Sequence, residues 1–125
     1  MLKILHITNE ITKKNFSISS LINYISRHGN KKNFFKSNVL CSDVDSKQKN
    51  KNLIISKIRW RNFFELRKIF LNKVEIYDVI HIHGIWAPIQ LYSIILCLIY
   101  SKKTIIHPHG MLLYPAINHN GLIKK

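Results

Sequence analysis

Two His-x-His-Gly motifs carry the side chains of this sequence that are best suited to chemistry. Residues 81–84 read His-Ile-His-Gly, and residues 107–110 read His-Pro-His-Gly. A short run of apolar, mostly β-branched residues precedes each motif, which is typical of a buried strand that runs into a loop. Imidazoles can orient a substrate, exchange a proton near neutral pH or ligate a metal ion. We therefore expect any chemistry to lie at the ends of these two strands.

The alternation of side chains along a strand sets the direction of these histidines. His81 and His83 point to the same face of an extended strand. Pro108 cannot donate to a sheet ladder, so the second strand should end before His109, and Gly110 is free to turn the chain sharply. Ligands of open α/β sheets bind outside the carboxyl ends of the strands, which is where both glycine-bearing loops fall.

Strand-like and helix-like segments alternate along the chain that must position these motifs. We predict strands at residues 2–8, 37–41, 53–55, 78–83 and 103–106, and helices at residues 17–28, 61–73 and 88–100. Gly29 is expected to supply the left-handed residue just past the first helix, and residues 9–15 and 43–52 are expected to be polar loops. This alternation predicts an α/β fold with a parallel sheet and right-handed crossovers.

The composition favours one basic domain over residues 1–125. The chain is 46% hydrophobic, enough for a modest core, and its formal net charge is +14. Because the lysines are scattered, we interpret the charge as a solvated surface, with attraction to anionic lipid or phosphate-bearing substrates as the alternative and no specific nucleic-acid partner. Cys41 and Cys97 are expected to be buried free thiols in a reducing cytoplasm. The longest apolar stretch, residues 85–100, is too short to cross a bilayer.

A metal site is the rival interpretation of the two motifs, because neighbouring His-x-His pairs would offer four imidazoles to Zn²⁺. A metal-dependent hydrolase also needs a carboxylate nearby. Asp78 begins the strand that His83 ends and should lie roughly 16 Å away, on the opposite edge of the sheet, at about 3.3 Å per residue. Only Glu10 is placed to be close. We therefore expect no bound metal.

Three segments together resemble the N-terminal half of the family 4 glycosyltransferases of the GT-B fold. They read Met-Leu-Lys-Ile-Leu-His-Ile-Thr at residues 1–8, Asp-Val-Ile-His-Ile-His-Gly-Ile-Trp at residues 78–86 and His-Pro-His-Gly-Met-Leu at residues 107–112. The resemblance spans nearly the whole chain and is weakest over residues 30–57. It implies a Rossmann-like domain that binds a sugar acceptor and faces a second domain that binds a nucleotide-sugar donor, with no resident cofactor.

The resemblance also implies roles for individual residues. His83 would be the catalytic residue, orienting the sugar and stabilising positive charge near the developing oxocarbenium ion. Trp86 would stack on a sugar ring or a lipid-linked carrier. The other substrate-binding positions are Asn9, Glu10, Gly84, His109, Gly110 and Met111. The purely structural alternatives are a hydrogen-bonded strand-end histidine for His83 or His109 and a core residue for Trp86, and a structural role is the expectation for His6, His28 and His81.

Two departures from the family pattern bear on activity. The first βα loop offers Asn15, Phe16 and Ser17 where the family usually has adjacent glycines, and Phe16 would obstruct approach to the donor diphosphate. The donor domain is also missing. We therefore expect a fragment that is inactive alone and belongs to cell-envelope polysaccharide or lipopolysaccharide synthesis at the inner membrane surface. It would need a second chain carrying the donor domain, and the alternative is a non-catalytic remnant.

Overall fold

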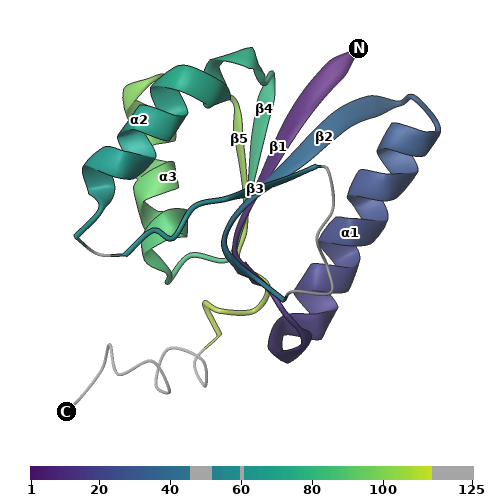
Figure 1. Ribbon diagram of the computed structural model, residues 1–125, viewed down its shortest axis with the longest axis horizontal. Coiled ribbons are helices and arrows are strands. Elements are labelled where there is room, and N and C mark those ends of the chain that lie inside the picture. The colour runs from purple at the N-terminus through teal and green to yellow at the C-terminus, as the bar shows by residue number, and fades with distance from the viewer. Residues whose placement is uncertain (46–51, 60, 114–125) are drawn as a thin grey trace.

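A computed structural model describes residues 1–45, 52–59 and 61–113 of the chain (Figure 1). Within these residues, five parallel strands form one sheet in the order β3-β2-β1-β4-β5. The strands are β1 (Leu2–Ile11), β2 (Phe35–Val44), β3 (Leu53–Ile55), β4 (Val79–His83) and β5 (Thr104–His107). The helices are α1 (Phe16–Lys31), α2 (Phe63–Lys73) and α3 (Pro88–Ile99), and 3-10 turns lie at η1 (Lys13–Asn15) and η3 (Val74–Ile76).

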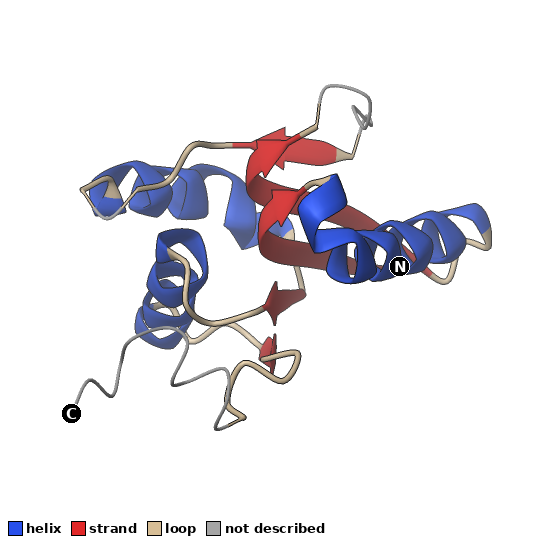
Figure 2. Ribbon diagram, turned by 90° about the horizontal axis from the view of Figure 1, so that it is seen from below, coloured by secondary structure: helices blue, strands red, loops and turns tan. Residues whose placement is uncertain are grey.

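The sheet is the middle layer of three. Figures 1 and 2 show α1 on one side of the sheet and α2 and α3 on the other. The larger apolar core lies under α2 and α3 and includes Leu5, Ile7, Leu40, Leu66, Phe70, Ile80, Ile82 and Leu96. A smaller cluster under α1 contains Ile11, Ile22, Val39 and Cys41. This architecture confirms the predicted α/β fold with a Rossmann-like parallel sheet flanked by helices.

Strand alternation places the histidines on the α1 side of this sheet. In β4, Ile80 and Ile82 enter the larger core, so His81 and His83 project to the other face. The register of β1 against β4 pairs His6 with His81, and that of β4 against β5 pairs His83 with His107. Residues paired in this way share a face, so three neighbouring strands contribute imidazoles to one surface.

The strand order puts the switch of the fold between β1 and β4. β1 is the middle strand: the chain passes through α1 to β2 and β3 on one side, then returns to β4 and β5 on the other. Open α/β sheets bind ligands at the carboxyl ends of the strands that flank such a switch. α1 packs on β1 and β2, whereas Ile105 of β5, which pairs with His81 and so lies on the α1 side, is 54% exposed. The histidine-bearing half of the α1 side is therefore the more open half.

Most predicted elements are confirmed, and β3 matches its predicted bounds. The predicted loop at residues 9–15 was wrong at its start, because Asn9 and Glu10 belong to β1, which pairs with β2 as far as Ile11 and Val44. The loop predicted for residues 43–52 was also wrong at its start, since Asp43 is part of β2, and residues 46–51 lie outside the described residues.

Gly29 does not end the first helix as predicted. It lies inside α1, and the left-handed residue past the helix is Asn33, with φ 55°. A Cβ at Gly29 would meet the ring of Phe35, so the absence of a side chain here lets an aromatic ring from β2 pack directly against the helix backbone.

The two cysteines are buried free thiols, as predicted. Burial raises the pKa of the Cys41 thiol to about 12 and raises that of Cys97 as well, so both stay protonated at neutral pH. Across the described ranges of the chain, no helix combines the length and the apolar character that crossing a bilayer requires.

Candidate functional site

Five histidines from the middle of β1, from β4 and from the end of β5 and its turn lie together and are called the histidine cluster: His6, His81, His83, His107 and His109. Nδ1 of His6 lies 3.0 Å from Nε2 of His83, and Nδ1 of His83 lies 3.0 Å from Nε2 of His109. These three rings form a continuous hydrogen-bonded row from the sheet interior to its rim. His81 lies against His83 with ring centroids 4.0 Å apart, and His107 stacks on His109 at 3.9 Å.

The loop after β4 is fixed by a glycine and a buried glutamine. Gly84 has φ +88°, and a Cβ there would lie 2.5 Å from Nε2 of Gln90. Gln90 donates from Nε2 to the carbonyl of His83 and accepts on Oε1 from the backbone N–H of Ala87, 3.0 Å away. The amide of Gly84 donates to the carbonyl of His107 at 2.9 Å. These bonds hold the end of β4 against both β5 and the start of α3.

A tight turn after β5 brings His109 back onto the cluster. His109 and Gly110 have φ 50° and 77°, and the amide of Met111 donates to the carbonyl of Pro108 at 3.0 Å. Positive φ at both central residues is the requirement of a type I′ turn. The predicted end of the strand at Pro108 and the predicted sharp turn at Gly110 are both confirmed. The turn directs the His109 imidazole toward His83 and His107 rather than away from the sheet.

Burial keeps the inner histidines neutral. Desolvation, helped by the neighbouring His81, lowers the pKa of His6 to about 4. Desolvation, with further repulsion from the surrounding imidazoles, lowers the pKa of His83 to about 2. The pKa values of His81 and His109 are lowered by burial and by His107. At neutral pH these rings therefore carry no charge, and each offers one N–H and one bare nitrogen.

Neutral rings hydrogen-bonded in a row must share their tautomers. When His109 donates from Nε2 to Nδ1 of His83, His83 donates from Nε2 to Nδ1 of His6; when the direction reverses, all three rings change tautomer together. Nε2 of His6 is buried without a hydrogen-bond partner in either case, and so is Nε2 of His81. The inner end of the row is thus closed, while its outer member, His109, is partly exposed and stacks on the exposed His107.

A cavity of about 210 Å³ lies beside the cluster at the switch between β1 and β4. Its walls are Thr8, Asn9, Ile18, Trp86, Ala87, Gln90 and Met111. Trp86 donates from Nε1 to the carbonyl of Met111 at 3.2 Å, which ties the loop after β4 to the turn after β5. The cavity is smaller than the roughly 300–1,000 Å³ of typical small-molecule sites, and it joins an aromatic wall to amide and hydroxyl groups.

The structure brings most of the predicted site residues to one edge of the sheet. Asn9, Trp86 and Met111 line the cavity, while Gly84, His109 and Gly110 shape or join the histidine cluster. Glu10 lies at the end of β1 but is not among the lining residues. Asp78 lies at the opposite edge, as expected, where its Oδ2 accepts from the amide of Lys3 at 2.7 Å.

His83 sits deeper than an open cleft would place it. Its side chain is 0% exposed, and both ring nitrogens are hydrogen-bonded within the cluster. His109 is the partly exposed member of the row, so a ligand at the rim meets His109 before His83.

Sequence reasoning did not connect His6 or Gln90 to the site. His6 is 1% exposed and was expected to be structural; only the register that pairs it with His81 brings it beside the cluster. Gln90 had a weak signal, because a polar residue interrupts an otherwise apolar stretch of α3. A buried glutamine in such a stretch must find hydrogen-bond partners, which here are the backbone atoms at the end of β4.

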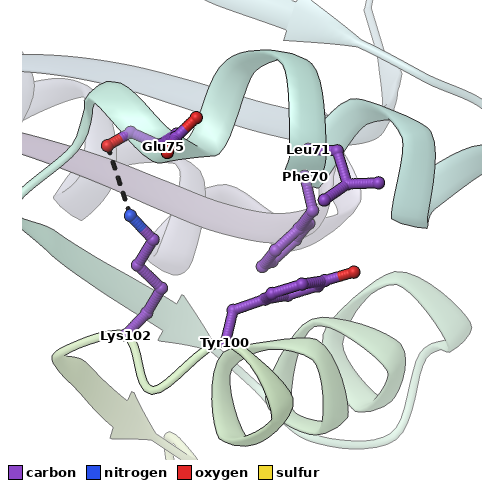
Figure 3. Close-up of a pocket in the computed structure, with 5 residues that line it drawn as sticks. All are labelled: Phe70, Leu71, Glu75, Tyr100 and Lys102. Carbon is purple, nitrogen blue, oxygen red and sulfur yellow. Dashed lines mark hydrogen bonds between the residues drawn. The ribbon is translucent and has the colours of Figure 1, made fainter.

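A second cavity, of about 220 Å³, lies where α2 and α3 end, near the amino ends of the strands (Figure 3). The rings of Phe70 and Tyr100 lie side by side there, and Nζ of Lys102 donates to the carbonyl of Glu75 at 3.2 Å. It shares no residue with the histidine cluster and lies away from the edge where α/β sheets bind ligands. The candidate site is therefore the histidine cluster with its neighbouring cavity.

Comparison of the chain with protein-family models, with curated proteins and with solved structures finds no match in any of the three.

Proposed function

We propose that this chain is the acceptor-binding half of a glycosyltransferase that transfers a sugar from a nucleotide-sugar donor to a glycan or a lipid-linked acceptor in cell-envelope polysaccharide synthesis. The observation that carries the proposal is the cavity at the switch between β1 and β4, walled by Trp86 and by Gln90, whose side chain donates to the carbonyl of His83 in the neighbouring histidine cluster. The likeness of residues 78–86 and 107–112 to the family 4 glycosyltransferases supports the same assignment.

The cavity has the chemistry that recognises one sugar ring. Trp86 offers an apolar face for the C–H groups of a pyranose, while Thr8 and Asn9 offer hydroxyl and amide groups for its hydroxyls. Its small volume suits a single ring whose other face is covered by a further element. This is what a site divided between two domains requires.

His83 is proposed to orient the reacting hydroxyl rather than to remove its proton. A pKa lowered to about 2 makes the buried ring a poor base, but its neutral nitrogen remains a good hydrogen-bond acceptor. Because Nδ1 of His83 is bonded to His109, the acceptor hydroxyl must take the place of the His109 ring. The turn that carries His109 therefore has to move when the acceptor binds.

The donor side is proposed to come from further polypeptide, in the same protein or in a second chain. Exposed apolar side chains support this: Ile105 and Ile106 on β5 and Leu98 and Ile99 on α3 are 45% to 75% exposed. An edge strand with apolar side chains is an aggregation hazard unless it is covered. We propose that this further polypeptide covers the edge and brings the diphosphate-binding groups to the cavity.

Saccharide binding tests the proposal. Saturation-transfer NMR with monosaccharides, oligosaccharides and polyprenyl-linked sugars should detect weak binding to the chain, and Trp86→Ala should weaken it about tenfold. Tyr24→Ala is the matched control, because Tyr24 is an exposed aromatic residue on α1, 64% exposed and outside the cavity. Absence of saccharide binding, or an equal loss in both variants, would refute the proposal.

Transfer activity gives a second test. The chain alone should neither bind nor consume a nucleotide sugar, and activity should appear only when a polypeptide carrying a donor-binding domain is added. His83→Asn should then lower kcat, while His28→Asn, at an exposed position in the last turn of α1, should leave it unchanged. Sugar transfer by the chain on its own would contradict the division of the site.

The basic surface is proposed to hold the protein against anionic lipid at the cytoplasmic face of the membrane, where lipid-linked acceptors reside. A net charge of +14 favours such contact, at about 1 kcal/mol for each basic residue near the surface. The chain should sediment with phosphatidylglycerol vesicles and not with phosphatidylcholine vesicles, and added salt should release it. Equal binding to both vesicle types would count against this part of the proposal.

A further inference from the structure

The outer part of the histidine cluster has the donor set of a transition-metal site. His83, His107 and His109 each offer a ring nitrogen, and the three nitrogens lie within 4.8 Å of one another. Three ligands with M–N distances of about 2.0–2.1 Å hold their nitrogens roughly 3 Å apart. Nδ1 of His83 and Nε2 of His109 already lie 3.0 Å apart. The exposed His107 side chain can rotate to complete the set.

We propose that a divalent transition-metal ion, Zn²⁺ or a similar imidazole-preferring cation, binds to His83, His107 and His109 at the rim of the sheet. Its fourth position would face solvent at the exposed end of the cluster. The sequence alone predicted no bound metal, because Glu10 is the only carboxylate expected near the four imidazoles and His6 is not part of either motif.

His6 supplies a hydrogen-bond acceptor for the ring nitrogen of His83 that would not bind the metal. A histidine ligand usually donates its second ring N–H to a buried acceptor, which fixes its tautomer and its orientation. Nδ1 of His6, 3.0 Å from Nε2 of His83, is such an acceptor. With that bond donated by His83, its Nδ1 is bare and points toward His109 and the rim. His6 is therefore a positioning residue for the site and not a ligand.

An inner group of three histidines is the alternative set of ligands for the metal ion. His6, His81 and His83 also have nitrogens within 4.8 Å of one another. Nevertheless, His6 and His83 are 1% and 0% exposed, and a dication placed there would lose its hydration with three neutral ligands and no counter-charge. The rim group keeps one open position for water, so it is the better site.

The ligand chemistry limits which cations bind. Imidazole suits Zn²⁺, Ni²⁺, Co²⁺ and Cu²⁺, whereas Mg²⁺ and Ca²⁺ require oxygen ligands. An ion at the rim would also take Nδ1 of His83, the atom proposed to meet the acceptor hydroxyl. Metal and acceptor would then be alternative occupants, but metal binding itself does not depend on sugar transfer.

Titration of the EDTA-stripped, dialysed chain with ZnCl₂ tests the site, with Co²⁺ absorption as a second readout of nitrogen ligation. The expected result is one ion per chain, with no displacement by excess Mg²⁺. His107→Ala and His109→Asn should weaken binding more than about 100-fold, and His6→Asn by about 10- to 100-fold. Asparagine is chosen because it tolerates the positive φ of His109. His28→Ala is the control and should bind as the unaltered chain does.

Two outcomes overturn the inference. One is a chain that binds Zn²⁺ no more tightly than its His107→Ala variant. The other is binding that survives His107→Ala but disappears in His81→Ala, which would assign the ion to the inner group. Far-ultraviolet circular dichroism of each variant separates loss of the site from loss of the fold. Because no sugar is present, failure here leaves the glycosyltransferase proposal standing, and failure of saccharide binding leaves the metal site standing.

Discussion

Acidification should destabilise this protein through its buried histidines. The pKa of His6 is lowered to about 4 and that of His83 to about 2 in the folded chain, while both titrate near 6.5 when it is unfolded. Because the folded values are the lower ones, the unfolded chain takes up protons first as the pH falls. Their stabilising contribution is therefore complete above about pH 6.5 and is lost progressively below it.

The size of the effect follows from these two pKa values. Between pH 7 and pH 5, each ring loses about 2 kcal/mol of its contribution to the free energy of unfolding, or about 4 kcal/mol for the pair. The free energy of unfolding of a native protein is only about 5–15 kcal/mol, so this loss is a large share of the total stability. The lowered pKa values of His81 and His109 act in the same direction.

Urea unfolding at pH 7, 6 and 5, in the presence of EDTA to exclude metal, measures this dependence. About one third of the loss should already be present at pH 6, because the unfolded-state pKa lies near 6.5. His6→Leu should remove about half of the two-histidine effect, and His28→Ala should leave the pH dependence unchanged. An unfolding free energy that is the same at pH 5 as at pH 7 would show that the imidazole row is not buried as described.

Three substitutions test the packing around the site. Gly84→Ala should lower the unfolding free energy by about 1–3 kcal/mol, measured by urea denaturation, because φ is +88° and the new Cβ would meet Gln90. Gly29→Ala should also lower the unfolding free energy by about 1–3 kcal/mol, because the new Cβ would meet the Phe35 ring. Adding Phe35→Leu to this variant should restore part of the loss if the ring is the obstacle. Leu66→Ala, at a position 0% exposed, should lower stability by about 2–5 kcal/mol without changing Zn²⁺ affinity; unchanged thermal stability would contradict its place in the core.

The order and type of the elements could be predicted because local patterns determine them. β-branched runs gave the strands, spacings of three and four gave α2, and Pro88 marked the start of α3. The predicted boundaries are wrong where pairing with a neighbouring strand outweighs the local preference of the residues. Asn9 and Glu10 are polar, yet they extend β1 because β2 runs alongside and satisfies their backbone.

The site was only partly predictable, because its assembly depends on register. His81, His83 and the turn at Gly110 follow from the sequence near each motif. The link from His6 to His83 joins residues 77 positions apart and depends on β1 being the middle strand, which no local pattern reveals. The burial of His83 has the same origin, since rings from β1 and from the turn after β5 lie on both sides of it.

The direction of the hydrogen bonds in the imidazole row couples the tautomer of His6 to the rim of the sheet. Passing a proton inward along the row would leave His6 doubly protonated, because Nε2 of His6 has no partner to which it could release its own proton. An occupant of the rim that takes the hydrogen-bond position on Nδ1 of His83 instead favours one direction of the row, and with it one tautomer of His6 in the first strand. Nitrogen-15 chemical shifts of His6 would thus report on occupancy at a surface that His6 never touches.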